Sequence, residues 1–80
     1  MRITVRCFSH VRDALGADSL EIAIPEGARA RAVEERIRQM AGRRLEGIPL
    51  RLARNRAFVE PAEPLADGDE VSLLPPAQGG

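Results

Sequence analysis

Two stretches of alternating apolar and polar residues stand at opposite ends of this chain, and they constrain its fold more than any other feature. Near the N-terminus Ile3, Val5 and Cys7 alternate with other residues, and near the C-terminus Val71 and Leu73 do the same. A period of two is typical of a β-strand with one buried face. Both strands are candidates for the centre of a sheet, where they would lie parallel and send the C-terminus off one end.

Glycine, proline and other turn-forming residues divide the rest of the chain into short elements. We expect a short helix over 10–15 with Ser9 as its N-cap, a strand over 20–24, a turn over 25–27, a main helix ending at Gly42, a connector over 43–49, strands over 50–54 and 57–60 joined at Asn55-Arg56, and a last strand over 70–74. The first two strands are close in sequence and should pair antiparallel. Pro61 and Pro64 keep the fourth strand out of the centre of the sheet.

The main helix is recognised by its helical spacing. Val33, Ile37, Met40 and Ala41 form the predicted apolar stripe, while Arg31, Glu34, Glu35 and Arg38 are expected to face water. Glu34 and Arg38 stand four residues apart, the spacing of a favourable ion pair on a helix surface. The helix start at 28–30 has no good capping residue.

These elements predict an α+β fold of the β-grasp type, with a mixed sheet of about five strands and helices packed on one face. Eighty residues make one domain. We place that domain at 1–76, followed by a flexible tail over 77–80. A chain of this length buries roughly 60–65% of its unfolded surface, which favours a module that acts through partners.

Composition excludes several functions. The 12 arginines balance the 12 acidic residues, so we expect no nucleic-acid partner. One cysteine and one histidine exclude zinc and iron–sulfur sites, and we expect no metal. Cys7 is predicted to be a buried thiol and His10 a surface residue. Without an apolar run of about 20 residues we expect no membrane association and a cytoplasmic location.

The chain ends on Gly79-Gly80, shortly after Pro75-Pro76. Two residues without Cβ atoms form a thread that fits a narrow channel, and the terminal carboxylate is an oxygen nucleophile at neutral pH. That group is suited to attack on the α-phosphate of ATP inside another protein. The alternative is an ordinary frayed terminus.

Three motifs extend this interpretation. The stretch over 8–16, F-S-H-V-R-D-A-L-G, resembles a family's opening to its first helix; 65–71, L-A-D-G-D-E-V, resembles its turn before the last strand; and 73–80, L-L-P-P-A-Q-G-G, resembles its tail. The family is the MoaD-type sulfur-carrier small subunit of molybdopterin synthase, in the ThiS and ubiquitin-like β-grasp superfamily. The tail departs from it at Ala77-Gln78, where the family often has valine and a small residue.

The resemblance implies a sulfur carrier. An E1-like adenylating enzyme of the MoeB type would activate the Gly80 carboxylate with its own ATP and Mg²⁺, and a cysteine desulfurase or rhodanese would supply sulfur to form a thiocarboxylate. The large synthase subunit, of the MoaE type, would form a heterotetramer with this carrier and pass the sulfur to precursor Z, and two loaded carriers would be consumed per product. This chain itself would bind no cofactor, and catalytic residues would lie on the large subunit. Gly79 would give access to the narrow channel.

A docking surface follows from strand phase. Phe8 and Leu74 are out of phase with the buried positions, and matching Phe58 to the family's pattern places it outward too. With Pro75 and Pro76 these residues are the candidate partner-binding residues. The alternatives that stay open are a sulfur carrier for thiazole (thiamine), cysteine or tRNA thiolation pathways, and a β-grasp module that binds without covalent chemistry.

Overall fold

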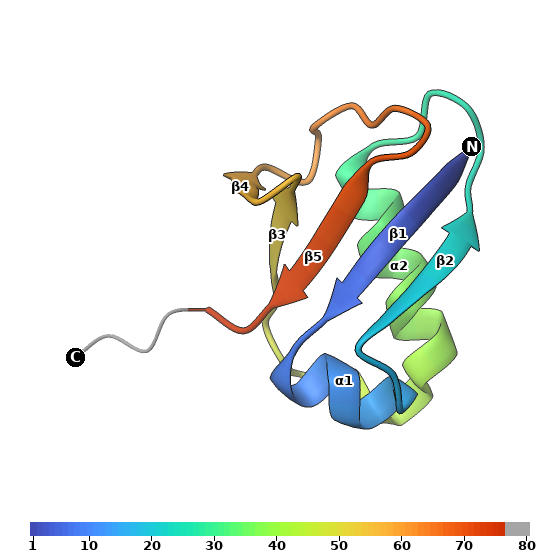
Figure 1. Ribbon diagram of the computed structural model, residues 1–80. Helices are drawn as coiled ribbons and strands as arrows, with labels where there is room; N and C mark the ends of the chain where they lie inside the picture. The colour runs from blue at the N-terminus through green and yellow to red at the C-terminus, as the bar shows by residue number, and fades with distance from the viewer. Residues whose placement is uncertain (77–80) are drawn as a thin grey trace.

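The computed structural model describes residues 1–76, and in it a five-stranded mixed sheet carries helices on one face (Figure 1). The elements are β1 (Arg2–Cys7), α1 (Ser9–Leu15), β2 (Ser19–Ala23), α2 (Ala30–Ala41), the 3-10 helix η1 (Gly42–Leu45), β3 (Arg51–Arg54), β4 (Ala57–Val59) and β5 (Glu70–Leu74). This arrangement confirms the predicted α+β class.

The strands follow the order β2-β1-β5-β3-β4 across the sheet. The two strands from opposite ends of the chain, β1 and β5, lie side by side and parallel, as expected for two central strands. All other neighbours pair antiparallel, including β1 with β2. The observed strands differ from the predicted ranges by no more than one residue at each end, which is the usual uncertainty of strand ends.

The β3–β4 hairpin turns at the predicted residues. Asn55 and Arg56 have φ angles of 49° and 75°, the positive values that a tight two-residue hairpin requires at both central positions. The hairpin places β4 at the edge of the sheet, where the prolines that follow it cost no hydrogen bonds of the central ladder.

The core lies between α2 and the sheet. Its largest fully buried side chains are Ile3, Val5, Val11, Val33, Ile37, Leu45, Val71 and Leu73. Every apolar residue that alternation placed inward on β1 and β5 is therefore buried. The predicted surface position of His10 and buried position of Cys7 are also confirmed.

The apolar stripe of α2 differs from the prediction at one position. Met40 is 52% exposed and does not belong to the core, whereas Ala30 is fully buried. At 100° per residue, Ala30, Val33, Ile37 and Ala41 span one arc, and Met40 falls beyond its margin on the Val33 side. Leu45, which was assigned to a connector, lies on η1 and fills the core beyond the end of α2.

Arg38 also departs from its expected position, because its side chain is half-buried. Its Nε donates to Glu34 Oε2 at 2.9 Å, which confirms the predicted i,i+4 pair. The other guanidinium nitrogens donate to the carbonyl oxygens of Leu45 at 2.8 Å and Ile48 at 2.7 Å. Arg38 thereby supplies hydrogen bonds that the chain after α2 cannot find within a regular ladder.

The first helix begins one residue earlier than predicted. Its N-cap position is Phe8, whose backbone is extended, and no side chain caps it. Ser9 is the first helical residue and has a φ of 50°, so its hydroxyl does not occupy the capping position.

Candidate functional site

The central strand β5 carries the chain to the end of the sheet at which α1 lies (Figure 1). Hydrogen-bonded neighbours on both sides, β1 and β3, hold its direction. Pro75 and Pro76 follow directly and are half-buried. A proline has no N–H to continue a ladder, so the pair ends the strand and fixes φ for the chain that leaves it. The predicted reactive residues, Gly79 and Gly80, and the tail over 77–80 lie outside the described residues.

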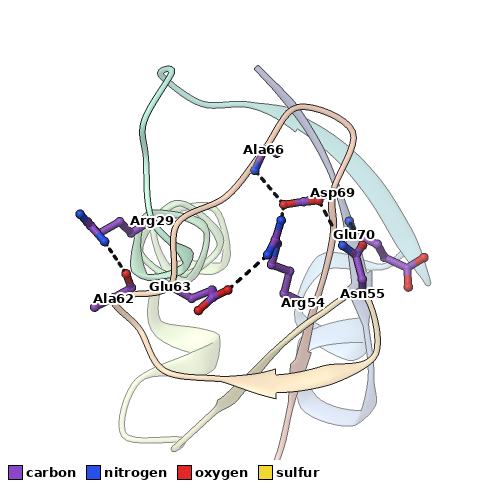
Figure 2. Close-up of polar contacts among 8 residues, drawn as sticks. All are labelled: Arg29, Arg54, Asn55, Ala62, Glu63, Ala66, Asp69 and Glu70. Atoms are coloured by element: carbon purple, nitrogen blue, oxygen red, sulfur yellow. Dashed lines mark hydrogen bonds and ion pairs between the residues drawn. The ribbon is translucent and has the colours of Figure 1, made fainter.

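The start of β5 is held by a cluster of polar side chains around Asp69 (Figure 2). Asp69 is 8% exposed. Its Oδ2 accepts from Arg54 Nε and from the Ala66 amide, each at 2.7 Å, and its Oδ1 accepts from Asn55 Nδ2 at 3.1 Å. In return, Asn55 Oδ1 accepts from the Glu70 amide at 3.0 Å. The cluster ties the hairpin turn to the turn that starts β5.

These contacts control the protonation of Asp69. Burial on its own raises the pKa of this carboxyl group. The hydrogen bonds from Arg54, Ala66 and Asn55, together with the charge of Arg54, outweigh burial and hold the pKa below its ordinary value of 3.8. Asp69 is therefore an anion at neutral pH, and its role is structural.

The same cluster reaches the N-terminus of α2. Arg54 Nη1 also contacts Glu63 Oε2 at 3.2 Å, and the Glu63 carbonyl accepts the Ala30 amide at 2.9 Å. Arg29 Nη1 donates to the Ala62 carbonyl at 2.7 Å, and the Pro61 carbonyl accepts the Arg31 amide at 2.8 Å. Loop carbonyls thus satisfy the helix start for which the sequence offered no capping side chain.

The three predicted docking residues are apolar side chains in the outward phase of the sheet, on the face opposite the core. Phe58 is 59% exposed and Phe8 is 36% exposed. Leu74 is half-buried and points away from the face that buries Val71 and Leu73. We call Phe8, Phe58 and Leu74 the apolar patch.

Sheet pairing fixes the relative positions of the three residues of the apolar patch. Phe58 pairs with Ala53 on β3, and Leu74 pairs with Arg51 on the same strand. The β1–β5 register sets Cys7 beside Leu73, so Phe8 follows at the level of Leu74. Phe8 and Leu74, which are 66 positions apart in sequence, therefore lie level with each other at the end of β5. Phe58 lies level with Ser72, two residues earlier, and β3 separates its strand from β5.

Two arginines accompany this patch, and the sequence interpretation missed both. The Arg51 guanidinium lies 3.9 Å from the centre of the Phe58 ring, and that of Arg6 lies 5.7 Å from the centre of the Phe8 ring. Strand phase could have found them, because Arg6 and Arg51 share the outward phase of their strands.

The remaining candidates for chemistry do not form a catalytic pair. Cys7 is buried, and burial together with the nearby charge of Asp18 raises the pKa of its thiol above 9.0. His10 is on the surface beside an open hollow of about 310 Å³ that Asp13, Ala14 and Arg44 also line. Within residues 1–76, no group of three His, Cys, Asp or Glu side chains could hold a metal ion. In the same part of the chain, no helix combines the length and hydrophobicity of a bilayer span.

The chain is similar to known proteins over nearly its whole length. The model of the ThiS family matches residues 5–80. The molybdopterin synthase sulfur carrier subunit of Escherichia coli (strain K12) is 35% identical over 81 residues, which cover 98% of this chain and 99% of that protein.

Two solved structures add to this comparison. A protein described as molybdopterin converting factor, subunit 1, from Pyrococcus furiosus has a TM-score of 0.86 and 30% identity, and the match covers 96% of this chain and 99% of that one. In the complex of subunits 1 and 2 of molybdopterin-converting factor from Helicobacter pylori, the matched chain has a TM-score of 0.67, 25% identity and full coverage of both chains.

Proposed function

This chain belongs to the ThiS family, and from that membership we propose that it is the sulfur carrier of molybdopterin synthesis. The observation that carries the proposal is the end-to-end match with the Escherichia coli sulfur carrier subunit, which takes in 99% of that protein. The resemblance of the tail motif and the parallel β1–β5 pair, which directs the chain off the sheet, support the same function.

The reacting group in this proposal is the carboxylate of Gly80, and the family match extends to that residue. Its oxygen attacks the α-phosphorus of ATP, and pyrophosphate leaves. The terminal sulfur of a persulfide then attacks the acyl carbon and displaces AMP. Cleavage of the resulting acyl disulfide by a thiol leaves a C-terminal thiocarboxylate. Gly79 serves access, because a side chain there would widen the thread that enters the partner's channel.

The tail has the reach that this chemistry requires. From Pro75 to Gly80 the chain can span at most about 20 Å when extended. The two prolines restrict the conformations available before binding, so less entropy is lost when a partner orders the tail. The reacting end can thus enter a buried site of the partner while the folded domain stays at the entrance to that site.

Docking of the folded part is assigned to the apolar patch with Pro75 and Pro76. Three large apolar side chains on the outer face of the sheet, two of them level with the end of β5, form a surface that a partner can cover. The partner that receives the sulfur is the large subunit of molybdopterin synthase. The complex of subunits 1 and 2 from Helicobacter pylori, whose matched chain has this fold, supports such a pair.

The loading partners complete the proposal. An E1-like adenylating enzyme supplies the ATP and Mg²⁺ site, and a cysteine desulfurase or rhodanese supplies the persulfide. We assign the carrier and these loading enzymes to the cytoplasm. Among residues 1–76 the chain contributes position and docking surface, and the catalytic groups belong to its partners.

Intact mass spectrometry tests the reaction. The chain is incubated with its adenylating enzyme, ATP, Mg²⁺ and a persulfide donor, and we expect the mass increase of one oxygen replaced by sulfur at Gly80. A variant extended beyond Gly80 and the variant Gly79→Trp are the matched controls, and both should stay unmodified while retaining the wild-type circular dichroism spectrum. A tagged chain that still gains sulfur at Gly80 would refute the mechanism.

The pathway is tested by adding the large subunit and precursor Z to the loaded carrier. We expect formation of molybdopterin with loss of the thiocarboxylate. A carrier that is loaded normally but never consumed in this mixture belongs to another sulfur-transfer pathway. A chain that is never loaded is a binding module.

A further inference from the structure

The apolar patch is accompanied by a cation, the guanidinium of Arg51. The Arg51 guanidinium stacks at 3.9 Å on the ring of Phe58, which is itself 59% exposed. Cation and ring therefore form one surface feature at the outer face of the sheet. A ring that holds a guanidinium by its face restricts the side chain to few positions.

Stacking occupies the face of the guanidinium and leaves its edge available. The N–H groups of arginine point outward in the plane of the group, and their fork matches the two oxygens of a carboxylate. Within residues 1–76, no carboxylate forms an ion pair with Arg51. That includes Glu60, which follows β4 and lies near Arg51 in the hairpin. The donor edge of Arg51 is thus free to receive a carboxylate from outside.

Arg6 is less available. Its guanidinium lies 5.7 Å from the ring centre of Phe8, and it also contacts Glu70 Oε2 at 3.7 Å. The pair neutralises much of its charge. Of the two arginines beside the apolar patch, Arg51 therefore offers the stronger attraction to an anion.

Resting on the proposed function, we propose that Arg51 is a specificity residue of this carrier, which pairs with a carboxylate that the large synthase subunit presents beside its contact with Phe58. The apolar patch supplies contact area, and Arg51 decides which partner faces are accepted. A face with a carboxylate gains a two-pronged ion pair, whereas a face with a cation at that position is repelled.

The test measures association of the full-length carrier with its large subunit by titration calorimetry at low and high salt. We expect Arg51→Glu to weaken binding about tenfold or more at low salt, and Arg51→Leu to weaken it by less, because leucine keeps apolar contact with Phe58. The wild-type affinity should fall as salt rises, and that of Arg51→Leu should fall less. Phe58→Ala should weaken binding to a similar degree at both salt concentrations.

The matched control is Arg36→Glu, the same charge reversal at an exposed arginine on α2, on the helix-covered side of the sheet. We expect this variant to bind within about twofold of wild type, since a charge distant from the contact acts only through screened solvent. Circular dichroism checks that every variant is folded. Equal affinities of Arg51→Glu and Arg36→Glu would overturn the inference and leave the proposed function intact. A wild-type carrier that forms no complex with the large subunit would overturn both.

Discussion

The hydrogen bonds around Asp69 lead us to predict that loss of its charge lowers the free energy of unfolding substantially. The change is Asp69→Asn, which preserves the shape of the side chain but replaces one acceptor oxygen with a donor nitrogen. Asp69 accepts hydrogen bonds from Arg54, Asn55 and the Ala66 amide at 2.7–3.1 Å. An amide in the same place sets a donor against at least one of these donors and removes the negative charge opposite Arg54.

The magnitude follows from those contacts. A hydrogen bond to a charged group contributes about 1.5–3 kcal/mol, and an unsatisfied buried donor costs about 1–3 kcal/mol. Because the contacts share one carboxylate they do not add, and we expect a loss of about 3 kcal/mol at pH 7. A domain of 80 residues has a free energy of unfolding of roughly 4–12 kcal/mol. The variant should therefore melt about 12–24 °C lower than wild type.

The pH dependence of the free energy of unfolding provides a second test of this prediction. The folded protein holds the pKa of Asp69 below 3.8, so the unfolded chain takes up a proton first as pH falls. The stability from this carboxylate is fully present above the unfolded pKa and is lost as pH falls through the folded pKa. Asparagine does not titrate. The difference in stability between wild type and variant should consequently narrow as pH decreases below about 4.

Urea unfolding followed by circular dichroism at pH 7 and pH 3 measures both effects. Asp13→Asn is the matched control, since Asp13 is exposed on α1 and accepts no side-chain hydrogen bond within residues 1–76. It should change stability by less than about 0.5 kcal/mol. The reasoning fails if Asp69→Asn is within about 1 kcal/mol of wild type at pH 7, or if the difference is as large at pH 3.

Three further predictions concern the core, the thiol and the docking surface. Ile37→Ala should lower the free energy of unfolding by about 3 kcal/mol, whereas Met40→Ala, at a 52% exposed position, should lower it by less than about 1 kcal/mol. Equal losses in urea unfolding would contradict the assignment of the buried face of α2. Because burial raises the pKa of its thiol, Cys7 should react with iodoacetamide at pH 8 only after denaturation, as measured by mass spectrometry. Rapid labelling of the native chain would show instead that the thiol is accessible. Phe8→Asp should weaken association with the large subunit by about 2 kcal/mol or more while leaving the urea midpoint nearly unchanged; an unfolded variant would instead place Phe8 in the core.

Much of the fold could be predicted from local patterns in the sequence. Alternation on β1 and β5 identified the buried residues, and two positive-φ positions at Asn55-Arg56 agree with the turn expected there. These features depend on neighbours within a few residues, so they can be read from the chain directly. The outward position of Phe58 also agrees with the prediction, although it required the family resemblance and did not follow from the pattern.

The candidate site depended more on distant parts of the chain. The glycine tail and the outward positions of Phe8 and Leu74 could be proposed from residue type and strand phase alone, whereas Phe58 also needed the family resemblance. The pairing of Arg51 with Phe58 could not, because it needs the register between β3 and β4 and a choice of rotamer. The burial of Leu45 could not be predicted either, since it depends on how the chain turns after α2, whereas the exposure of Met40 agrees with helical spacing.

Sequence by itself determined the periodicity of each strand, the positions of the turns and the residue types of the tail. These are properties of local backbone geometry, which steric limits impose within a few residues. Tertiary structure decided that Asp69 would join a hairpin, a loop and the start of β5, and that loop carbonyls would cap α2. Hydrogen bonds of this kind join segments far apart in the chain. Their partners are set by how the whole sheet and helix pack, because buried polar groups must find acceptors wherever the closed fold places them.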